Sequence, residues 1–270
     1  MKDVFGKDVE YLKGKKLFLL DMDGTIYEEN RLFEGTIEFL DKIRSIGGRY
    51  VFITNNSSRS VTAYIDKLNK MGIHADKEDF FTSAQATALH ILKNYPDKNV
   101  FCMGTRSLIM ELKEYGIRIT DSVEDTEVLL IGYDSELTYE KLRKASQILQ
   151  TKEVEYIATN PDKGCPVEFG LVPDCAAMCE MFYMITGKRP YYIGKPEPTM
   201  VNYVMEKYRN TKEETVIVGD RLYTDIKTGI NAGVTSICVL TGEATLDDII
   251  NGDVKPEVTL DSIRDITKIL

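Results

Sequence analysis

The chain has 270 residues, of which 43% are hydrophobic and 29% charged, and these proportions are typical of a globular protein with a substantial core. Its net charge of −9 argues against a nucleic-acid backbone or an anionic membrane as a constitutive partner. Small anions are not excluded, because a local group of cations can bind them. We expect no signal peptide and no membrane span, since no apolar stretch approaches about 20 residues. A cytoplasmic location is therefore predicted.

The cysteines are odd in number and show no paired spacing, which argues against a disulfide framework. They are Cys102, Cys165, Cys175, Cys179 and Cys238. Cys175 and Cys179 lie four residues apart on a predicted helix over 175–186, but neither His74 nor His90 is near them in the sequence. We therefore expect reduced thiols and no structural zinc site.

Short apolar runs alternate with helical patterns from the start of the chain. Strands are predicted at 17–20 and 50–53, and helices at 36–45 and 61–71, each helix followed by glycine. In the first helix, Ile37, Leu40 and Ile43 form the expected apolar stripe. This alternation is typical of α/β proteins with a mainly parallel sheet.

The pattern continues through the middle of the chain and resumes near its end. The predicted strands are 100–103, 128–131, 156–158, 216–218 and 237–240, and the predicted helices are 107–115, 139–149 and 175–186. Polar motifs follow the strands at both ends of the chain, whereas the middle carries none of them. We therefore predict a core formed by residues 1–82 and 187–270, interrupted by an inserted α/β domain over 83–186.

Four polar motifs stand at predicted strand ends or in adjoining loops. They are D-M-D-G-T at 21–25, T-N-N-S-S at 54–58, G-K-P-E-P at 194–198 and G-D-R-L-Y-T-D at 219–225. Ligands of open α/β sheets bind outside the carboxyl ends of the strands, so these motifs are expected to converge on one crevice. Their residue types are those that phosphoryl transfer needs, where catalysis is mostly positioning and charge neutralisation.

Asp21 and Asp23 follow a predicted buried strand, where unpaired carboxylates are costly unless they hold a cation. Asp21 is the candidate nucleophile, which would form an aspartyl-phosphate. Asp23 is the candidate acid and base, which would protonate the leaving oxygen and then deprotonate water. Mg²⁺ held by Asp21, Asp220 and the backbone carbonyl of Asp23 would offset the repulsion between carboxylate and phosphate.

The next two motifs supply candidate phosphate ligands. Thr54 and the backbone N–H groups of Asn55 and Asn56 suit a phosphate cradle, although the same residues also make an ordinary polar turn or helix cap. Lys195, restrained between Gly194 and Pro196, is a candidate to neutralise nucleophile and phosphate together, although most lysines are simply solvated.

Asp220 repeats the strand-end carboxylate of Asp21. Asp225 lies five residues further on, in the first turn of a predicted helix. It could hold the metal's waters or orient Lys195, or it could serve only the electrostatics of the helix N-terminus.

The four motifs, read as D-M-D-G-T-I-Y, I-T-N-N-S-S, I-G-K-P-E-P and V-G-D-R-L-Y-T-D, resemble the haloacid dehalogenase (HAD) superfamily. The resemblance is to its NagD-like or 4-nitrophenylphosphatase-like group (HAD subfamily IIA) and covers essentially the whole chain. It implies a Rossmannoid three-layer core with an inserted α/β cap domain, and the roles given above. Relatives often associate through the cap, so a homodimer is an open expectation.

The cap is less constrained by the resemblance. Thr159-Asn160-Pro161-Asp162 looks like the loop that faces the active site in relatives, and Asp174 lies in the expected substrate-specificity region. A turn or a helix cap explains these residues equally well.

These observations predict a Mg²⁺-dependent phosphomonoesterase acting on small phosphorylated metabolites, such as nucleotide, sugar or 4-nitrophenyl phosphates. A phosphotransferase or phosphomutase on the same scaffold is the alternative. A dehalogenase is disfavoured because its reaction needs no acid at the position of Asp23. A silent phospholigand-binding protein is disfavoured because none of the charged residues of the motifs is lost: Asp21, Asp23, Lys195 and Asp220.

Overall fold

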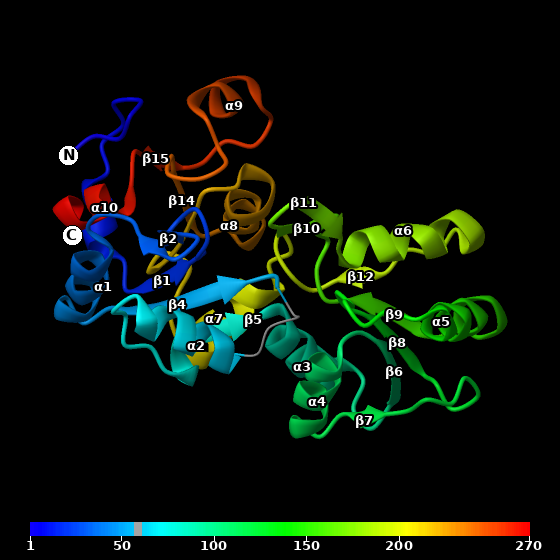
Figure 1. Cartoon of the computed structure of the whole chain (residues 1–270). Coiled ribbons are helices and arrows are strands. Elements are labelled where there is room, and N and C mark those ends of the chain that lie inside the picture. The colour runs from blue at the N-terminus through cyan, green and yellow to red at the C-terminus, as the bar shows by residue number, and fades with distance from the viewer. Residues whose placement is uncertain (57–60) are drawn as a thin grey trace. The chain divides into compact units, whose positions relative to one another are not determined.

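The computed structural model describes residues 1–56 and 61–270. The described chain forms two compact units (Figure 1). The core unit comprises Met1–Thr54, Val61–Phe81 and Lys195–Leu270, and the inserted unit comprises Asn55, Asn56 and Thr82–Gly194. The chain thus passes to the inserted unit after Thr54, belongs again to the core unit over Val61–Phe81, and lies in the inserted unit from Thr82 until it returns at Lys195.

The core unit is built on a six-stranded sheet in the order β15-β14-β13-β1-β4-β5, in which β15 to β4 run parallel. Its strands are β1 (Leu17–Leu20), β4 (Arg49–Thr54), β5 (Phe80–Thr82), β13 (Thr215–Gly219), β14 (Thr235–Val239) and β15 (Val258–Leu260). The chain order reverses beside β1, which places the ends of β1 and β13 at the kind of switch point where such sheets bind ligands.

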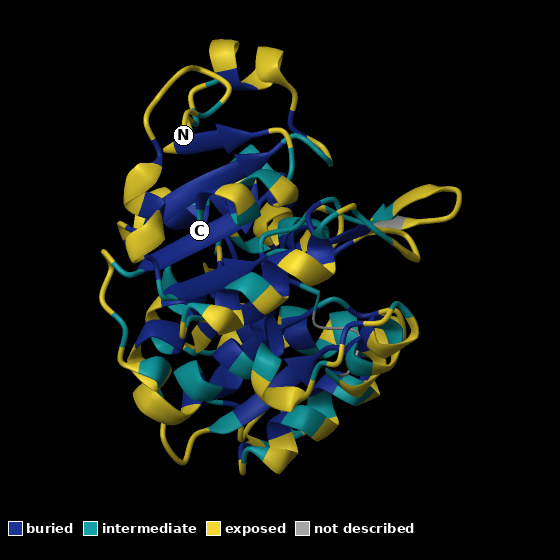
Figure 2. Ribbon diagram, turned by 90° about the vertical axis from the view of Figure 1, so that its left-hand side faces the viewer, coloured by how far each residue is buried: buried dark blue, intermediate teal, exposed yellow. Residues whose placement is uncertain are grey.

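Helices cover both faces of the core sheet. They are α1 (Thr36–Ser45), α2 (Val61–Lys70), α7 (Thr199–Tyr208), α8 (Lys227–Ala232) and α10 (Ile263–Ile269). Phe18 and Leu20 of β1 pack with residues of α1, α2 and α10 on one face. On the other face, α8 lies so close to β13 that a Cβ at Gly229 would stand 2.7 Å from Ile217 Cγ2. The strands are buried and the helices expose their outer sides (Figure 2).

The inserted unit has a five-stranded parallel sheet in the order β12-β9-β8-β6-β7. Its strands are β6 (Asn99–Met103), β7 (Arg118–Ile119), β8 (Val128–Ile131), β9 (Glu155–Ala158) and β12 (Tyr191–Tyr192). Its helices are α3 (Ser83–Asn94), α4 (Arg106–Glu114), α5 (Tyr139–Thr151) and α6 (Cys175–Thr186). Residues of α5 and α6 pack on one face of the sheet, and residues of α3 and α4 on the other.

Smaller elements complete the two units. They are η1 (Glu10–Gly14), β2 (Tyr27–Glu28), β3 (Arg31–Leu32), η2 (Lys77–Asp79), β10 (Gly164–Val167), β11 (Gly170–Pro173), η3 (Leu222–Ile226) and α9 (Leu246–Asn251). The antiparallel hairpin of β10 and β11 directly precedes α6.

The predicted α/β class with a mainly parallel sheet is confirmed. One detail was wrong: Ile37, expected in the buried stripe of α1, is 43% exposed, and Phe39 is buried instead. The expected insertion over 83–186 lies within the inserted unit, which continues to Gly194 because Tyr191 and Tyr192 pair with β9.

No helix in the described ranges, 1–56 and 61–270, is long and apolar enough to cross a membrane. The five cysteines, all of which lie in the described ranges, form no disulfide bond.

Candidate active site

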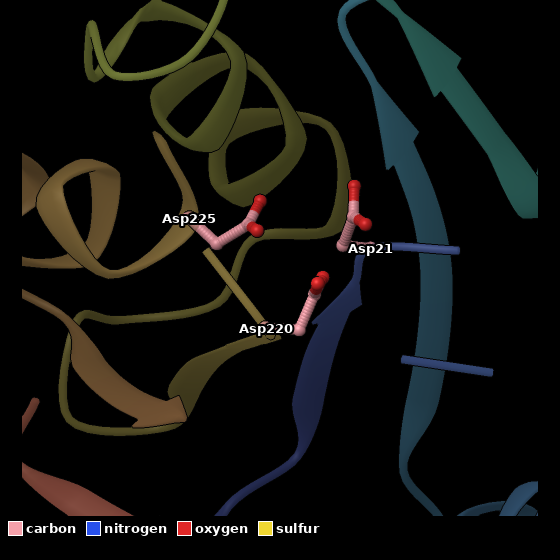
Figure 3. Close-up of side chains that lie close together, drawn as sticks. All are labelled: Asp21, Asp220 and Asp225. Atoms are coloured by element: carbon pink, nitrogen blue, oxygen red, sulfur yellow. The ribbon is translucent and has the colours of Figure 1, made fainter. Parts of the chain in front are cut away.

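Asp21 stands directly after β1, at the carboxyl end of the core sheet (Figure 3). Its backbone N–H donates to the carbonyl of Val218, 2.9 Å away, which extends the pairing of β1 with β13 by one residue. The Asp21 side chain is 16% exposed, so it is largely buried but reachable from solvent. A carboxylate in this position needs a cationic partner to offset its lost hydration.

Lys195 supplies that partner. Its ammonium donates to Asp21 Oδ1 at 2.5 Å and to Asp225 Oδ1 at 2.6 Å, and its side chain is 4% exposed. Burial by itself would lower the pKa of Lys195, but the charges of Asp21 and Asp225 outweigh that effect, and the pKa is raised. Lys195 therefore carries a fixed positive charge beside Asp21.

Asp220 follows β13 and is enclosed by two loops. Its carboxylate accepts hydrogen bonds from Thr25 Oγ1 at 3.3 Å and from the backbone N–H of Glu243 at 2.8 Å. A Cβ at Gly24 would stand 2.4 Å from Asp220 Oδ2, and one at Gly242 would stand 2.1 Å from the same oxygen. Glycine is required at both positions because the backbone approaches the carboxylate too closely for a side chain.

Three carboxylates meet at this edge of the sheet. One oxygen each of Asp21, Asp220 and Asp225 lies within 4.8 Å of the others (Figure 3). Burial, followed by the charge of Asp21, raises the pKa of Asp220 to about 6. A hard divalent cation would relieve this repulsion, and carboxylate oxygens are the ligands that Mg²⁺ takes. The donor set therefore fits Mg²⁺.

Asp23 and Asp225 stand differently toward this group. The side chain of Asp23 lies outside the group and is exposed, and it has no hydrogen-bond or ion-pair partner in the described part of the chain. Asp225, expected from the sequence to hold the metal's waters or to orient Lys195, is fully buried. In addition to the hydrogen bond from Lys195, it accepts one from the backbone N–H of Arg221 at 3.3 Å.

The candidate phosphate ligands occupy the first crossing between the units. Thr54 ends β4 and is 9% exposed. Asn55 and Asn56 belong to the inserted unit. Ser57 and Ser58, the last residues of the motif, lie outside the described residues.

The loop Thr159–Asp162 follows β9 in the inserted unit, as predicted. Its Asp162 accepts a hydrogen bond from Asn55 Nδ2, and its Asn160 is 1% exposed. Asp174 caps α6 through the backbone N–H of Cys175, and burial raises its pKa to about 6. The capping interpretation of Asp174 therefore has direct support.

One part of the core site was missed in the sequence. Residues 241–244, which follow β14, contact both Asp220 and the loop after β1. Thr241 Oγ1 donates to the carbonyl of Gly24 at 2.6 Å, and the backbone N–H of Glu243 donates to Asp220. These contacts come mostly from backbone atoms, so no residue type marked them. Only the position after a strand could have indicated them.

A mainly parallel sheet with helices on both faces and a polar site at the carboxyl ends of its strands places the core unit in the class of Rossmann-like α/β proteins. Comparison with known proteins refines this class. The haloacid dehalogenase-like hydrolase family model matches residues 18–118, and a HAD-hydrolase-like model matches residues 192–266.

Relatives match over nearly the full length. An acid sugar phosphatase of Staphylococcus aureus is 35% identical over 94% of this chain and 97% of that protein. The structure of a 4-nitrophenylphosphatase from Thermotoga maritima is 38% identical and superposes with a TM-score of 0.89, covering 96% of this chain and 98% of that one. A glycerol phosphate phosphatase from Mycobacterium tuberculosis, solved in complex with magnesium, is 28% identical, with a TM-score of 0.87 over 97% of this chain and 80% of that one. The chain belongs to the haloacid dehalogenase-like hydrolase family, in its NagD-like, 4-nitrophenylphosphatase-like branch.

Proposed function

We propose that this protein is a Mg²⁺-dependent phosphomonoesterase that hydrolyses small phosphorylated metabolites through an aspartyl-phosphate on Asp21. The predicted enzyme class, a phosphatase, is confirmed by the relatives named acid sugar phosphatase and 4-nitrophenylphosphatase. The observation that carries the mechanism is the position of Asp21, which lies between the buried ammonium of Lys195 and the carboxylate of Asp220.

In this mechanism a carboxylate oxygen of Asp21 attacks phosphorus. Lys195 donates a hydrogen bond to Asp21 and offsets part of the charge on the incoming phosphate. The Thr54 hydroxyl and the backbone N–H groups of Asn55 and Asn56 bind the phosphate oxygens.

Asp23 moves the protons. Its exposed carboxyl group donates a proton to the leaving oxygen and then accepts one from the water that hydrolyses the aspartyl-phosphate. Asp21, Asp220 and the backbone carbonyl of Asp23 would hold Mg²⁺, which would supply the positive charge that allows two anions to approach. Asp225 holds Lys195 in place from the opposite side.

The inserted unit is proposed as the cap that sets substrate preference, because the residues to which the mechanism assigns catalysis, Asp21, Asp23 and Lys195, all belong to the core unit. Relatives act on a sugar phosphate, a nitrophenyl phosphate and a glycerol phosphate, according to their names, which supports a small phosphorylated metabolite here. A homodimer and a cytoplasmic location stay predictions from the sequence.

The function is tested by phosphate release from a panel of monoesters, including 4-nitrophenyl, sugar and glycerol phosphates, with and without Mg²⁺. Asp21→Asn serves as the blank. We expect metal-dependent release by the wild type alone. Transfer of phosphate to an added alcohol or sugar in place of water would support the phosphotransferase alternative, and binding of esters without turnover would support a silent binding protein.

A further inference from the structure

Two of the points at which the chain crosses between the units, after Thr54 and before Lys195, contact the same loop of the inserted unit. Asn55 is the first residue after Thr54, and Gly194 is the last residue before Lys195. The loop Thr159–Asp162 contacts both of them. Two proposed phosphate-binding residues, Thr54 and Lys195, are therefore each one peptide bond away from a residue that contacts this loop.

Asn55 is held through its side chain and its backbone. Its Nδ2 donates to Asp162 Oδ2 at 2.7 Å, and its carbonyl accepts a bond from Ser83 Oγ at 2.6 Å. With 9% of its surface exposed, Asn55 has little freedom to exchange these partners for water. Removing a hydrogen-bond partner from a buried amide has a substantial energetic cost.

Asp162 is itself fixed from two directions. Its Oδ2 also accepts from Nδ2 of Asn160 at 2.7 Å, and its backbone carbonyl accepts from the N–H of Ala176 at 2.9 Å, in the first turn of α6. One carboxylate oxygen thus receives two amide donors. An ionised acceptor makes stronger hydrogen bonds than a neutral one, which explains why a carboxylate suits this position.

Gly194 contacts the loop Thr159–Asp162 and lies close to Asn55. Its N–H donates to the carbonyl of Thr159 at 2.8 Å. A Cβ on Gly194 would stand 2.5 Å from Asn55 Oδ1 and 2.8 Å from the Thr159 carbonyl oxygen. The two crossings therefore lie side by side, with no space for a side chain between them.

We propose that Asp162 is a positioning residue for phosphate binding. By holding the Asn55 side chain, it fixes the backbone that follows Thr54, so that the N–H groups of Asn55 and Asn56 meet the phosphate. This inference rests on the proposed function, since it names a residue that supports the same site. Asp162 acts through Asn55 and need not touch the substrate.

The experiment exchanges the two side chains. Asn55→Asp places two carboxylates together, Asp162→Asn leaves a neutral acceptor, and the double variant N55D/D162N restores one amide, one carboxylate and the original local charge. Measured in the presence of Mg²⁺ are the inhibition constant of inorganic phosphate, KM and kcat for 4-nitrophenyl phosphate, and the melting temperature.

We expect N55D to weaken phosphate binding about tenfold or more, because a hydrogen bond to a charged group is replaced by repulsion. The double variant should return to within about threefold of the wild type, because contacting residues are not additive. D162N should weaken phosphate binding less than N55D, and it provides a milder test if N55D does not fold.

Asp134→Asn is the matched control. Asp134 is a buried carboxylate of the same unit whose partner is Lys141, at 2.7 Å. Loss of the Asp134 charge should lower the melting temperature without changing the inhibition constant of phosphate.

The outcomes separate cleanly. If the wild type hydrolyses esters but the double variant loses phosphate affinity by the sum of the two single effects, the positioning role of Asp162 is overturned. The proposed function is untouched by that result. If N55D and D162N keep the wild-type inhibition constant of phosphate but melt at lower temperatures, the contact only stabilises the fold. That result would also overturn the positioning role of Asp162. A wild type that neither releases nor binds phosphate would overturn the proposed function, and the positioning role with it.

Discussion

The ammonium of Lys195 lies between the carboxylates of Asp21 and Asp225, 2.5 Å from Asp21 Oδ1 and 2.6 Å from Asp225 Oδ1. The three side chains come from segments that are far apart in the sequence, and all three are at least largely buried. A buried cation with two carboxylates leaves a net negative charge, and Asp220 adds to it. This arrangement favours binding of a divalent cation over an empty site.

Lys195→Met tests the charge balance of this group. The change keeps the length of the side chain but leaves Asp21 and Asp225 without their counter-charge. Removing one partner of a buried pair is expected to lower the free energy of unfolding by about 3–5 kcal/mol, and kcat/KM by more than about a hundredfold. Urea denaturation and steady-state kinetics measure both quantities. The exposed Lys70→Met is the control, and an equal effect of the two variants would contradict the assignment.

Asp21→Asn tests the nucleophile. The amide is nearly isosteric with the carboxylate, so the fold should persist, while turnover should fall below about a thousandth of the wild-type value because an amide cannot form the aspartyl-phosphate. Phosphate release, with circular dichroism as the check on folding, gives the answer. Activity within about tenfold of the wild type would remove Asp21 from this role.

Asp220→Ala tests the metal site directly. Loss of one of the proposed carboxylate ligands should weaken Mg²⁺ binding by tenfold or more, about 1.4 kcal/mol at least. Isothermal titration calorimetry with Mg²⁺ and no substrate measures this affinity independently of activity. An unchanged titration would exclude Asp220 as a ligand.

Gly242→Ala tests whether the loop after β14 shapes the metal site. A methyl group there would stand 2.1 Å from Asp220 Oδ2, so either the loop or the carboxylate must move. We expect weaker Mg²⁺ binding, again by calorimetry, with a modest loss of stability. Gly14→Ala is the matched control, since a Cβ at Gly14 meets nothing within 4 Å. Equal Mg²⁺ affinities of both variants would refute this role of the loop.

Glu111→Gln tests a buried acid in α4 of the inserted unit. Burial, aided by the charge of Glu114, raises the pKa of Glu111 from 4.5 to about 7. Because the folded-state pKa exceeds the unfolded one, the folded protein binds the proton more tightly, and stability is lost as pH rises from about 4.5 to about 7. The variant should therefore be about 1–2 kcal/mol more stable than the wild type at pH 8, and the difference should vanish near pH 4. Thermal melts of the variant and the wild type across this pH range measure it. A stability difference that is independent of pH would contradict the shift.

The sequence by itself determined many of the strands and helices and the residue types of the site. The strand Leu17–Leu20 and the helices Thr36–Ser45 and Cys175–Thr186 begin and end where the apolar periodicity and the capping residues indicate, because these signals are local. Asp21 and Asp220 were singled out because their motifs follow strands of one parallel sheet, whose carboxyl ends share an edge. Lys195 follows β12 of the other sheet and was singled out by its place between Gly194 and Pro196.

Only the tertiary structure decided which side chains meet. The pairing of Lys195 with both Asp21 and Asp225, the enclosure of Asp220 by Gly24 and Gly242, and the bond from Asn55 to Asp162 join residues that local patterns cannot connect. The same holds for β12, whose two residues carry no strand signal of their own and join the inserted unit by pairing with β9. These contacts depend on chain packing at long sequence separation, where propensity and periodicity carry no information.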